Sequence, residues 1–501
     1  MGRLTLAIAA AAVLTIGAAP APKMDADTAA WWRTTAELSN DSMEGRDTGS
    51  AAYLRAAKLV AAKFEAAGLK PAGENGSWFQ DVPMHEVRVT SATLHSGKTP
   101  LRFLHDLTIS PNAGTPARVA APLSYGGYCG AAALGDVRGR IVICHGTHKA
   151  GLPSASEREK AVRTAGAAGM LTIADPGFTV EPPRWPYAYA RTVTLADEKP
   201  ETDPFLKMTL NAASLGKLLG GSGRNAAALI AAGSAGKPLP SFALRDRLTA
   251  TFAIAQRGIS SPNVLAMLPG SDPKLADQAI ALSAHLDGYG YGEPVNGDRL
   301  YNGTLDDAAY VALLIRLAER RHGEAYRRPI LFAAWTGEEK GLLGSRWYVA
   351  HPTVPLSRIA GNINLDQLRP IFPLKLLTVH AIGDTTLGDD VRAVANGLGI
   401  EVQADPEPER NLLRRSDHWP FLQAGIPATG FVFGYKSGSK SEQIYRQWYR
   451  TGYHKPQDDL KQPMDFQAAG DFNRFFYALV ERVADQPQPP EWKPGSMLKP
   501  R

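Results

Sequence analysis

The chain is 501 residues long, which exceeds a single small domain and leads us to expect two or three domains. Its composition, with 44% hydrophobic and 21% charged residues, is that of a soluble globular protein. The net charge of +6 comes from scattered lysines and arginines, and the densest pairs, such as Arg320–Arg321, have no basic run beside them. A nucleic-acid-binding surface needs a clustered basic stripe, so this pattern argues against that class of protein.

The first residues, MGRLTLAIAAAAVLTIGAAPAPK, place Arg3 before an apolar run from Leu4 to about Ala19, with small residues after it. This layout is typical of a secretory signal peptide, which we assign to residues 1–21. The alternative is an uncleaved membrane anchor, but the run is short for a membrane span. We therefore expect a mature protein that is secreted or periplasmic and has no membrane span once the signal is removed.

Two amphipathic helices are predicted next, over AWWRTTAELS (30–39) and SAAYLRAAKLVAAKFEAAGL (50–69), because apolar residues recur there at helical spacing. Gly68 is expected to end the second helix. Residues 74–110 alternate apolar and polar side chains, which predicts strands.

The pattern changes from about Pro116. The segment LGDVRGRIVICHG (134–146) predicts a turn and a strand, and EREKAVRTAGAAGMLTIAD (157–175) predicts a helix, a glycine turn and another strand. A polar helix is predicted over NAASLGKLLGGS (211–222). This order resembles the protease-associated domain, a small module usually inserted in peptidase-type domains and carrying no chemistry of its own.

Both cysteines of the chain, Cys129 and Cys144, fall in this module. In an oxidising compartment they can form a local disulfide, and two buried free thiols are the alternative. The sequence leaves both readings open.

From Asn263 onward, apolar strands alternate with helices. This predicts an α/β domain whose mostly parallel, mixed sheet is covered by helices on both faces. The predicted strands are AIALSAHLDG, RPILFAAWT, IAGNINLDQ, LKLLTVHAIG and IPATGFVFG, and the predicted helices are DDAAYVALLIRLAERR, 387–398 and 465–484. The proline-rich tail, residues 487–501, is expected to be irregular.

Residues of the metal-binding type gather in this domain: several follow its strands, Asp306 and Asp307 open a helix, and His454 comes from YHKPQDD. Each has an ordinary explanation when taken singly, since an Asp often caps a helix and a Glu pair often faces solvent. As a set they are harder to explain, because carboxylates gathered at one sheet edge would repel one another unless a cation joined them. The set comprises His285, Asp287, Asp306, Asp307, Glu338, Glu339, Asp366 and His454.

Six pieces, in order over residues 263–484, resemble the di-zinc aminopeptidases, a family of co-catalytic zinc exopeptidases. They are HLD, NGTLDDAA, GEEKGLLGS, NLD, RRSDHWPFLQAGIPA and YHKPQDD. The resemblance implies a zinc-exopeptidase fold, two zinc ions per chain, and peptide substrates with a free amino terminus. The domains it implies are a signal peptide (1–21), a first catalytic part (22–115), a smaller β-rich α/β protease-associated insertion (116–245), a metallopeptidase catalytic domain (246–486) and the tail (487–501).

The resemblance also implies a role for each residue that matches a motif. Asp306 would bridge two metals, Glu338 would be the general base, and Tyr453 would polarise the scissile carbonyl. Asp287 would orient His285 through its second ring nitrogen. The metal ligands would be His285, Asp306, Glu339, Asp366 and His454, and the substrate-binding residues Arg415, Ser416 and Asp417. His418 is expected to be structural or to contact substrate rather than to bind metal, and the insertion is expected to supply no catalytic residue.

Three alternatives stay open on this reading. A glutaminyl cyclase shares the fold but uses one zinc, whereas this chain has a full five-ligand set. A carboxypeptidase or dipeptidase is chemically close, and Arg415 could hold a substrate carboxylate. A non-catalytic receptor-like binding protein can combine the same domains, but such relatives lose ligands or the base.

Overall fold

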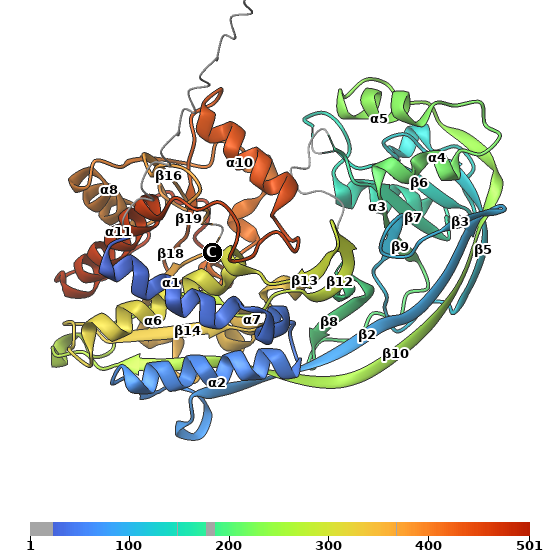
Figure 1. Cartoon of the computed structure of the whole chain (residues 1–501). Coiled ribbons are helices and arrows are strands. Elements are labelled where there is room, and N and C mark those ends of the chain that lie inside the picture. Colours follow the sequence, from blue (N-terminus) through green and yellow to red (C-terminus); the bar gives the residue numbers. More distant parts are fainter. Residues whose placement is uncertain (1–23, 148, 177–185, 367, 501) are drawn as a thin grey trace, which may run out of the picture.

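The computed structural model describes residues 24–147, 149–176, 186–366 and 368–500. The predicted signal peptide, residues 1–21, lies outside the described residues. The chain forms a larger and a smaller lobe, joined by two long strands, β2 (Phe79–Ser96) and β10 (Phe242–Leu268), which curve from one lobe to the other (Figure 1). These strands pair antiparallel from Val264 opposite Phe79 to Leu248 opposite Ser96, so one ladder runs through both lobes. No helix of the described part is long and apolar enough to cross a membrane.

The larger lobe is built on a sheet whose central strands are parallel. Its strand order is β18-β15-β11-β14-β10, and all neighbours are parallel except the antiparallel pair β14–β10. The predicted fold class is therefore confirmed for this lobe. The bounds are β11 Ala279–His285, β14 Ile330–Trp335, β15 Ile359–Asn364 and β18 Ala428–Thr429.

Helices cover both faces of this sheet, because its strands are apolar on both sides. In β11, Ile280 and Leu282 face one core while Ala279 and Ala281 face the other. The first core also holds α1 (Ala26–Ser39), α2 (Ala51–Ala66), α6 (Ala309–Arg321), α8 (Leu387–Gly397), α10 (Lys440–Thr451) and α11 (Phe466–Asp485). The second holds α7 (Leu343–Ala350) and α9 (His418–Gln423). Helix α10 was not predicted.

The smaller lobe has its own core and a parallel run of strands, β5-β6-β7-β9, closed by the antiparallel strand β4. A disulfide joins Cys129 to Cys144, whose Cα atoms are 5.5 Å apart, so the disulfide alternative is the one the structure adopts. The predicted helix over 211–222 is confined to Leu215–Leu218. The bounds are β4 Leu107–Ile109, β5 Arg118–Tyr125, β6 Ile141–His145, β7 Gly169–Ile173, β9 Leu206–Leu210, α3 Ala155–Thr164, α4 Leu215–Leu218 and α5 Ala226–Ser234.

The predicted insertion boundaries, 116 and 245, do not coincide with breaks in structure. β4 lies before residue 116, and β10 continues across residue 245 without interruption. Part of the predicted insertion returns to the larger lobe, where β8 (Arg191–Leu195) pairs with β2. Shorter strands complete the structure: β1 Lys70–Pro71, β3 Thr99–Leu101, β12 Gly290–Val295, β13 Asp298–Tyr301, β16 Leu376–Val379, β17 Glu401–Gln403 and β19 Phe431–Phe433.

Candidate metal centre

Three parallel strands bring polar residues to one edge of the sheet. His285 is the last residue of β11 and is paired with Trp335, the last residue of β14. Glu338 follows β14 within three residues, and Asp366 follows β15 within two. Because parallel strands end on the same edge, side chains from distant parts of the sequence meet there.

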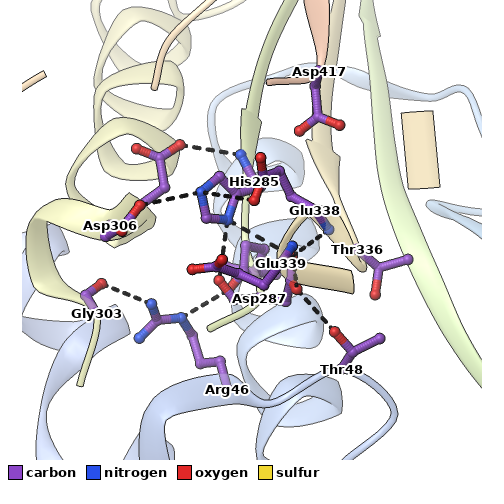
Figure 2. A network of polar contacts seen from close by, with 12 residues as sticks. Arg46, Thr48, His285, Asp287, Gly303, Asp306, Thr336, Glu338, Glu339 and Asp417 are labelled. Atoms are coloured by element: carbon purple, nitrogen blue, oxygen red, sulfur yellow. Dashed lines mark hydrogen bonds and ion pairs between the residues drawn. The ribbon is translucent and has the colours of Figure 1, made fainter. Parts of the chain in front are cut away.

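A tight turn before α6 presents the paired aspartates. Gly303 has φ +59°, and a Cβ on it would lie 2.5 Å from the carbonyl oxygen of Asp306, so the turn requires glycine at this position. The guanidinium of Arg46 donates to the Gly303 carbonyl from a fully buried position (Figure 2). The turn sets Asp306 and Asp307 opposite His285.

Two groups of metal-type ligand atoms result, each with its atoms within 4.8 Å of one another. One is His285, Asp307 and Asp366, and the other is Asp306, Glu339 and His454. The Asp306 carboxylate faces both groups, with Oδ1 3.5 Å from His285 Nε2 and Oδ2 3.0 Å from His454 Nε2. This is the position that a bridging carboxylate needs.

The burial of so many carboxyl groups shifts their pKa values. Burial raises the pKa of Glu339 to about 8, with the Asp306 charge adding to the effect. Burial also raises the pKa of Glu338 well above its usual range, since the charge of His285 only partly opposes it. Burial has the same effect on Asp307, reinforced by the charge of Asp366. In Asp306 the burial effect is outweighed by the Arg369 guanidinium and the two histidines, which hold its pKa well below the usual value.

The donor set fits zinc. Imidazole nitrogens and carboxylate oxygens are its ordinary ligands in proteins. Within the described part of the chain, Asp307 Oδ1 and Glu339 Oε1 are buried and make no hydrogen bond. Uncompensated buried oxygens are costly, and a divalent cation would compensate them and reverse the upward pKa shifts.

Asp287 organises the backbone around these groups. Its carboxylate accepts from Thr48 Oγ1 at 2.8 Å and from the Glu338 N–H at 3.0 Å (Figure 2). His285 Nδ1 lies 3.1 Å from the carbonyl oxygen of Asp287 and 3.7 Å from its carboxylate. The orienting contact to the imidazole therefore comes mainly from the Asp287 carbonyl, although the sequence pointed to the carboxylate.

Tyr453, Ser416 and Asp417 lie around this centre. The ring of Tyr453 stacks on His454 with centroids 3.6 Å apart. Ser416 and Asp417 are buried; Ser416 accepts from Asn364 at 2.7 Å, and Asp417 accepts from Ser345. These contacts favour a supporting role for both, and substrate binding by the RSD motif stays a prediction.

His418 belongs to neither ligand group. It is buried, and its ring lies 4.9 Å from that of His380, which is also buried. Burial lowers the pKa of His380 to about 4 and that of His418 well below its usual value. This position agrees with the structural alternative in its prediction.

Four residues at the centre carried no assigned role in the sequence analysis. Asp307 groups with His285 and accepts from its backbone N–H at 3.1 Å. Arg369 is fully buried, with Nη2 3.3 Å from Asp306 Oδ1. Tyr289 donates to Glu339, and Tyr189 of the predicted insertion donates to Tyr289. Tyr289, four residues after His285, could have been suspected from its loop, but nothing in the sequence pointed to Tyr189 or Arg369.

The fold and the strand-end cluster together define a metallo-exopeptidase. Residues 263–480 match peptidase family M28, which confirms the resemblance found from the motifs. The match covers less than half of the chain, and the enzyme class predicted from the sequence, a metallo-exopeptidase, is confirmed. The match does not extend to residues 116–245, so the protease-associated assignment stays a prediction.

Relatives with known names agree with this class. The chain is 25% identical to leupeptin-inactivating enzyme 1 of Streptomyces exfoliatus over 67% of this chain and 73% of that enzyme. It is 25% identical to aminopeptidase YwaD of Bacillus subtilis over 46% of each chain, and it spans 41% of a probable leucine aminopeptidase 2 of Aspergillus oryzae at 26% identity. The chain thus spans less than half the length of these last two relatives.

Solved structures show the same fold. BSAP, a zinc aminopeptidase from Bacillus subtilis, superposes with a TM-score of 0.64 at 18% identity, covering 93% of this chain and 97% of that one. An aminopeptidase from Aneurinibacillus sp. strain AM-1 gives 0.60 at 19% identity, covering 95% and 96%.

Proposed function

We propose that this protein is a secreted or periplasmic aminopeptidase that holds two zinc ions and removes amino-terminal residues from peptides. The observation that carries the two-metal assignment is the Asp306 carboxylate, which faces a histidine of each ligand group. The relatives include the aminopeptidase named above and a probable zinc metalloprotease of Pyrenophora tritici-repentis, 27% identical over 42% of this chain and 54% of that protein, which supports zinc and this substrate class.

We assign one zinc to Glu339 and His454 and the other to His285 and Asp366, with Asp306 shared between them. Asp307 would support the second group, because one of its oxygens already accepts from the His285 backbone. Bound zinc would lower the pKa of water and polarise the scissile carbonyl.

The protein's own residues would move the protons. Glu338 would take a proton from the attacking water on its carboxylate and deliver it to the leaving amine, which balances the hydrolysis. The location of the Glu338 carboxylate, 3.9 Å from His285 Nε2, supports both of these proton transfers. Tyr453 would donate a hydrogen bond from its hydroxyl to the carbonyl oxygen as negative charge develops there.

The charge of the centre favours an amino terminus over a carboxyl terminus. Carboxyl groups at the centre outnumber the buried guanidinium groups of Arg46 and Arg369 beside them, and two zinc ions would offset part of this excess of negative charge. Arg369 is already committed to Asp306 and to the carbonyl of Leu305. A substrate ammonium group would be attracted to such a site, whereas a substrate carboxylate would be repelled.

The experiment compares four substrates: leucine p-nitroanilide, its N-acetyl form, a separate peptide blocked at the amino end, and a peptide beginning with glutamine. Elemental analysis of the same protein measures its zinc content. We expect hydrolysis of the free-amino substrate only, close to two zinc ions per chain, and loss of activity with a chelator. Cleavage of the amino-blocked peptide would favour a carboxypeptidase, and cyclisation of the glutaminyl peptide with one zinc would favour a cyclase. No turnover by the fully loaded protein would favour a binding protein.

A further inference from the structure

Tyr189 belongs to the predicted insertion but lies at the metal centre. It is part of a short 3-10 turn, Tyr187–Ala190, which leads directly into β8. Because β8 pairs with β2, this segment is fixed against the larger lobe. The Tyr189 hydroxyl lies 3.1 Å from that of Tyr289 and 3.5 Å from His454 Nδ1.

The hydroxyl of Tyr289 links two ligands of the same metal group. It donates to Glu339 Oε2, and it lies 3.1 Å from His454 Nδ1. A hydroxyl has one proton to donate and two lone pairs to accept with. With its proton on Glu339, Tyr289 can only accept from Tyr189 and from a protonated Nδ1 of His454.

In this arrangement the atoms that would bind a metal are His454 Nε2 and Glu339 Oε1. With the proton of His454 on Nδ1, the lone pair is on Nε2, which faces Asp306 Oδ2 at 3.0 Å and Glu339 Oε1 at 3.5 Å. Glu339 Oε2 is occupied by Tyr289, and Oε1 makes no hydrogen bond within the described chain. Outer partners of this kind fix the tautomer and the orientation of ligands.

The ring contacts follow the same path, from Tyr189 through Tyr289 to His454. Tyr189 meets Tyr289 edge to face with centroids 5.2 Å apart, and Tyr289 meets His454 in the same manner at 4.6 Å. Tyr289 is almost fully buried, so its hydroxyl cannot readily replace a lost partner with water.

We propose that Tyr189 is a positioning residue of the metal centre, acting through Tyr289 on Glu339 and His454. The inference rests on the proposed function, since it assumes that these two residues bind zinc. The expectation that the insertion supplies no catalytic residue is unaffected, since Tyr189 would act through Tyr289. This segment would complete one of the two metal sites, and the peptidase domain would not reach full zinc affinity without it.

The test measures Zn²⁺ binding to the metal-free, full-length protein in competition with a chromophoric chelator. Tyr189→Phe removes only the hydroxyl. Loss of a residue that hydrogen-bonds to a metal ligand typically lowers metal affinity about 10–100-fold. We therefore expect Tyr189→Phe to lower the affinity for one zinc ion by about tenfold and to leave the affinity for the other unchanged. Tyr289→Phe should lower the affinity of the same ion further. Tyr187→Phe is the matched control, because Tyr187 is on the same turn, is 41% exposed and has its hydroxyl 3.4 Å from Arg299 instead.

A second measurement separates positioning from a general structural role. Peptidase activity of Tyr189→Phe should be low at limiting zinc and return to the wild-type kcat at saturating zinc, while the thermal midpoint of the metal-free protein stays unchanged. Unaltered binding of both ions by Tyr189→Phe would overturn the inference and leave the proposed function standing. Equally weakened binding of both ions, together with a lower thermal midpoint of the metal-free protein, would also overturn the inference. Failure of the wild-type protein to bind zinc would overturn both.

Discussion

Glu338 and Glu339 are neighbours in the sequence, yet the structure leads us to expect opposite results when each is changed to glutamine. Glu339 belongs to a ligand group and has one oxygen without a hydrogen-bond partner in the described chain. Glu338 belongs to neither group, and it lies next to His285. Glu338→Gln should therefore keep the metals and lose hydrolysis, whereas Glu339→Gln should lose a metal.

The expected magnitudes differ as well. General-base catalysis contributes about 10²–10⁴-fold, so kcat of Glu338→Gln should fall by at least about a hundredfold with zinc content unchanged. The ligand atoms around Glu339 lie within 4.8 Å of one another, so a cation among them is near its carboxylate. At an effective dielectric constant of about 20, unit charges about 4 Å apart interact by about 4 kcal/mol, and Zn²⁺ carries two charges, so zinc affinity should fall by at least roughly a thousandfold.

The assay combines zinc content after dialysis with kcat at saturating zinc for both variants. Wild-type zinc content with little activity in Glu338→Gln, and low zinc content with activity restored by added zinc in Glu339→Gln, would support the division of roles. The reverse pattern would refute it, and equal metal loss in both variants would mean that Glu338 is also a ligand.

Three further outcomes are expected. Asp306→Asn should lose both zinc ions and lower the thermal midpoint, because it also leaves the buried Arg369 without its carboxylate; metal analysis and calorimetry measure this. Replacing Cys129 and Cys144 together by alanine opens a loop with a sequence separation of 15, which should cost about 3 kcal/mol in the smaller lobe, measured by denaturant unfolding. Acidification should destabilise the protein through His380: burial lowers its pKa to about 4, so the unfolded state binds the proton first. Stability is then lost as the pH falls from about 6.5 toward 4, by about 1 kcal/mol at pH 5.5, and His380→Gln should remove this part of the pH dependence in urea titrations.

Each of these outcomes has a result that would contradict it. An Asp306→Asn protein with one zinc still tightly bound would show that the carboxylate is not shared. Unchanged unfolding of the double cysteine variant would mean that the disulfide constrains nothing in the unfolded chain. An unaltered acid dependence in His380→Gln would assign the acid loss to other groups, with His418 the first to test, since burial holds its pKa low as well.

Local sequence patterns determined the elements around the site. The apolar runs of β11, β14 and β15 are buried strands, and the residues after each run lie at the sheet edge, because the carboxyl ends of parallel strands share one edge. For this reason His285, Glu339 and Asp366 could be expected to meet, whereas the ligand roles of all five residues were implied by the family resemblance. The structure brings all five together in two groups with Asp306 between them. Their metal-binding roles stay a prediction until metal is measured.

The contacts that support these ligands were decided by the tertiary structure alone. Tyr189 and His454 are 265 residues apart, and they meet because β8 pairs with β2 and carries the turn before it to the larger lobe. Arg369 reaches Asp306 from the loop after β15, and that carboxylate compensates much of the cost of burying its charge. Apolar residues repeat every two residues in a strand and every 3.6 in a helix, which shows which face of the element is buried. This repeat does not show which distant element packs against that face. The ligands could therefore be predicted from the sequence, and the residues that hold them in place could not.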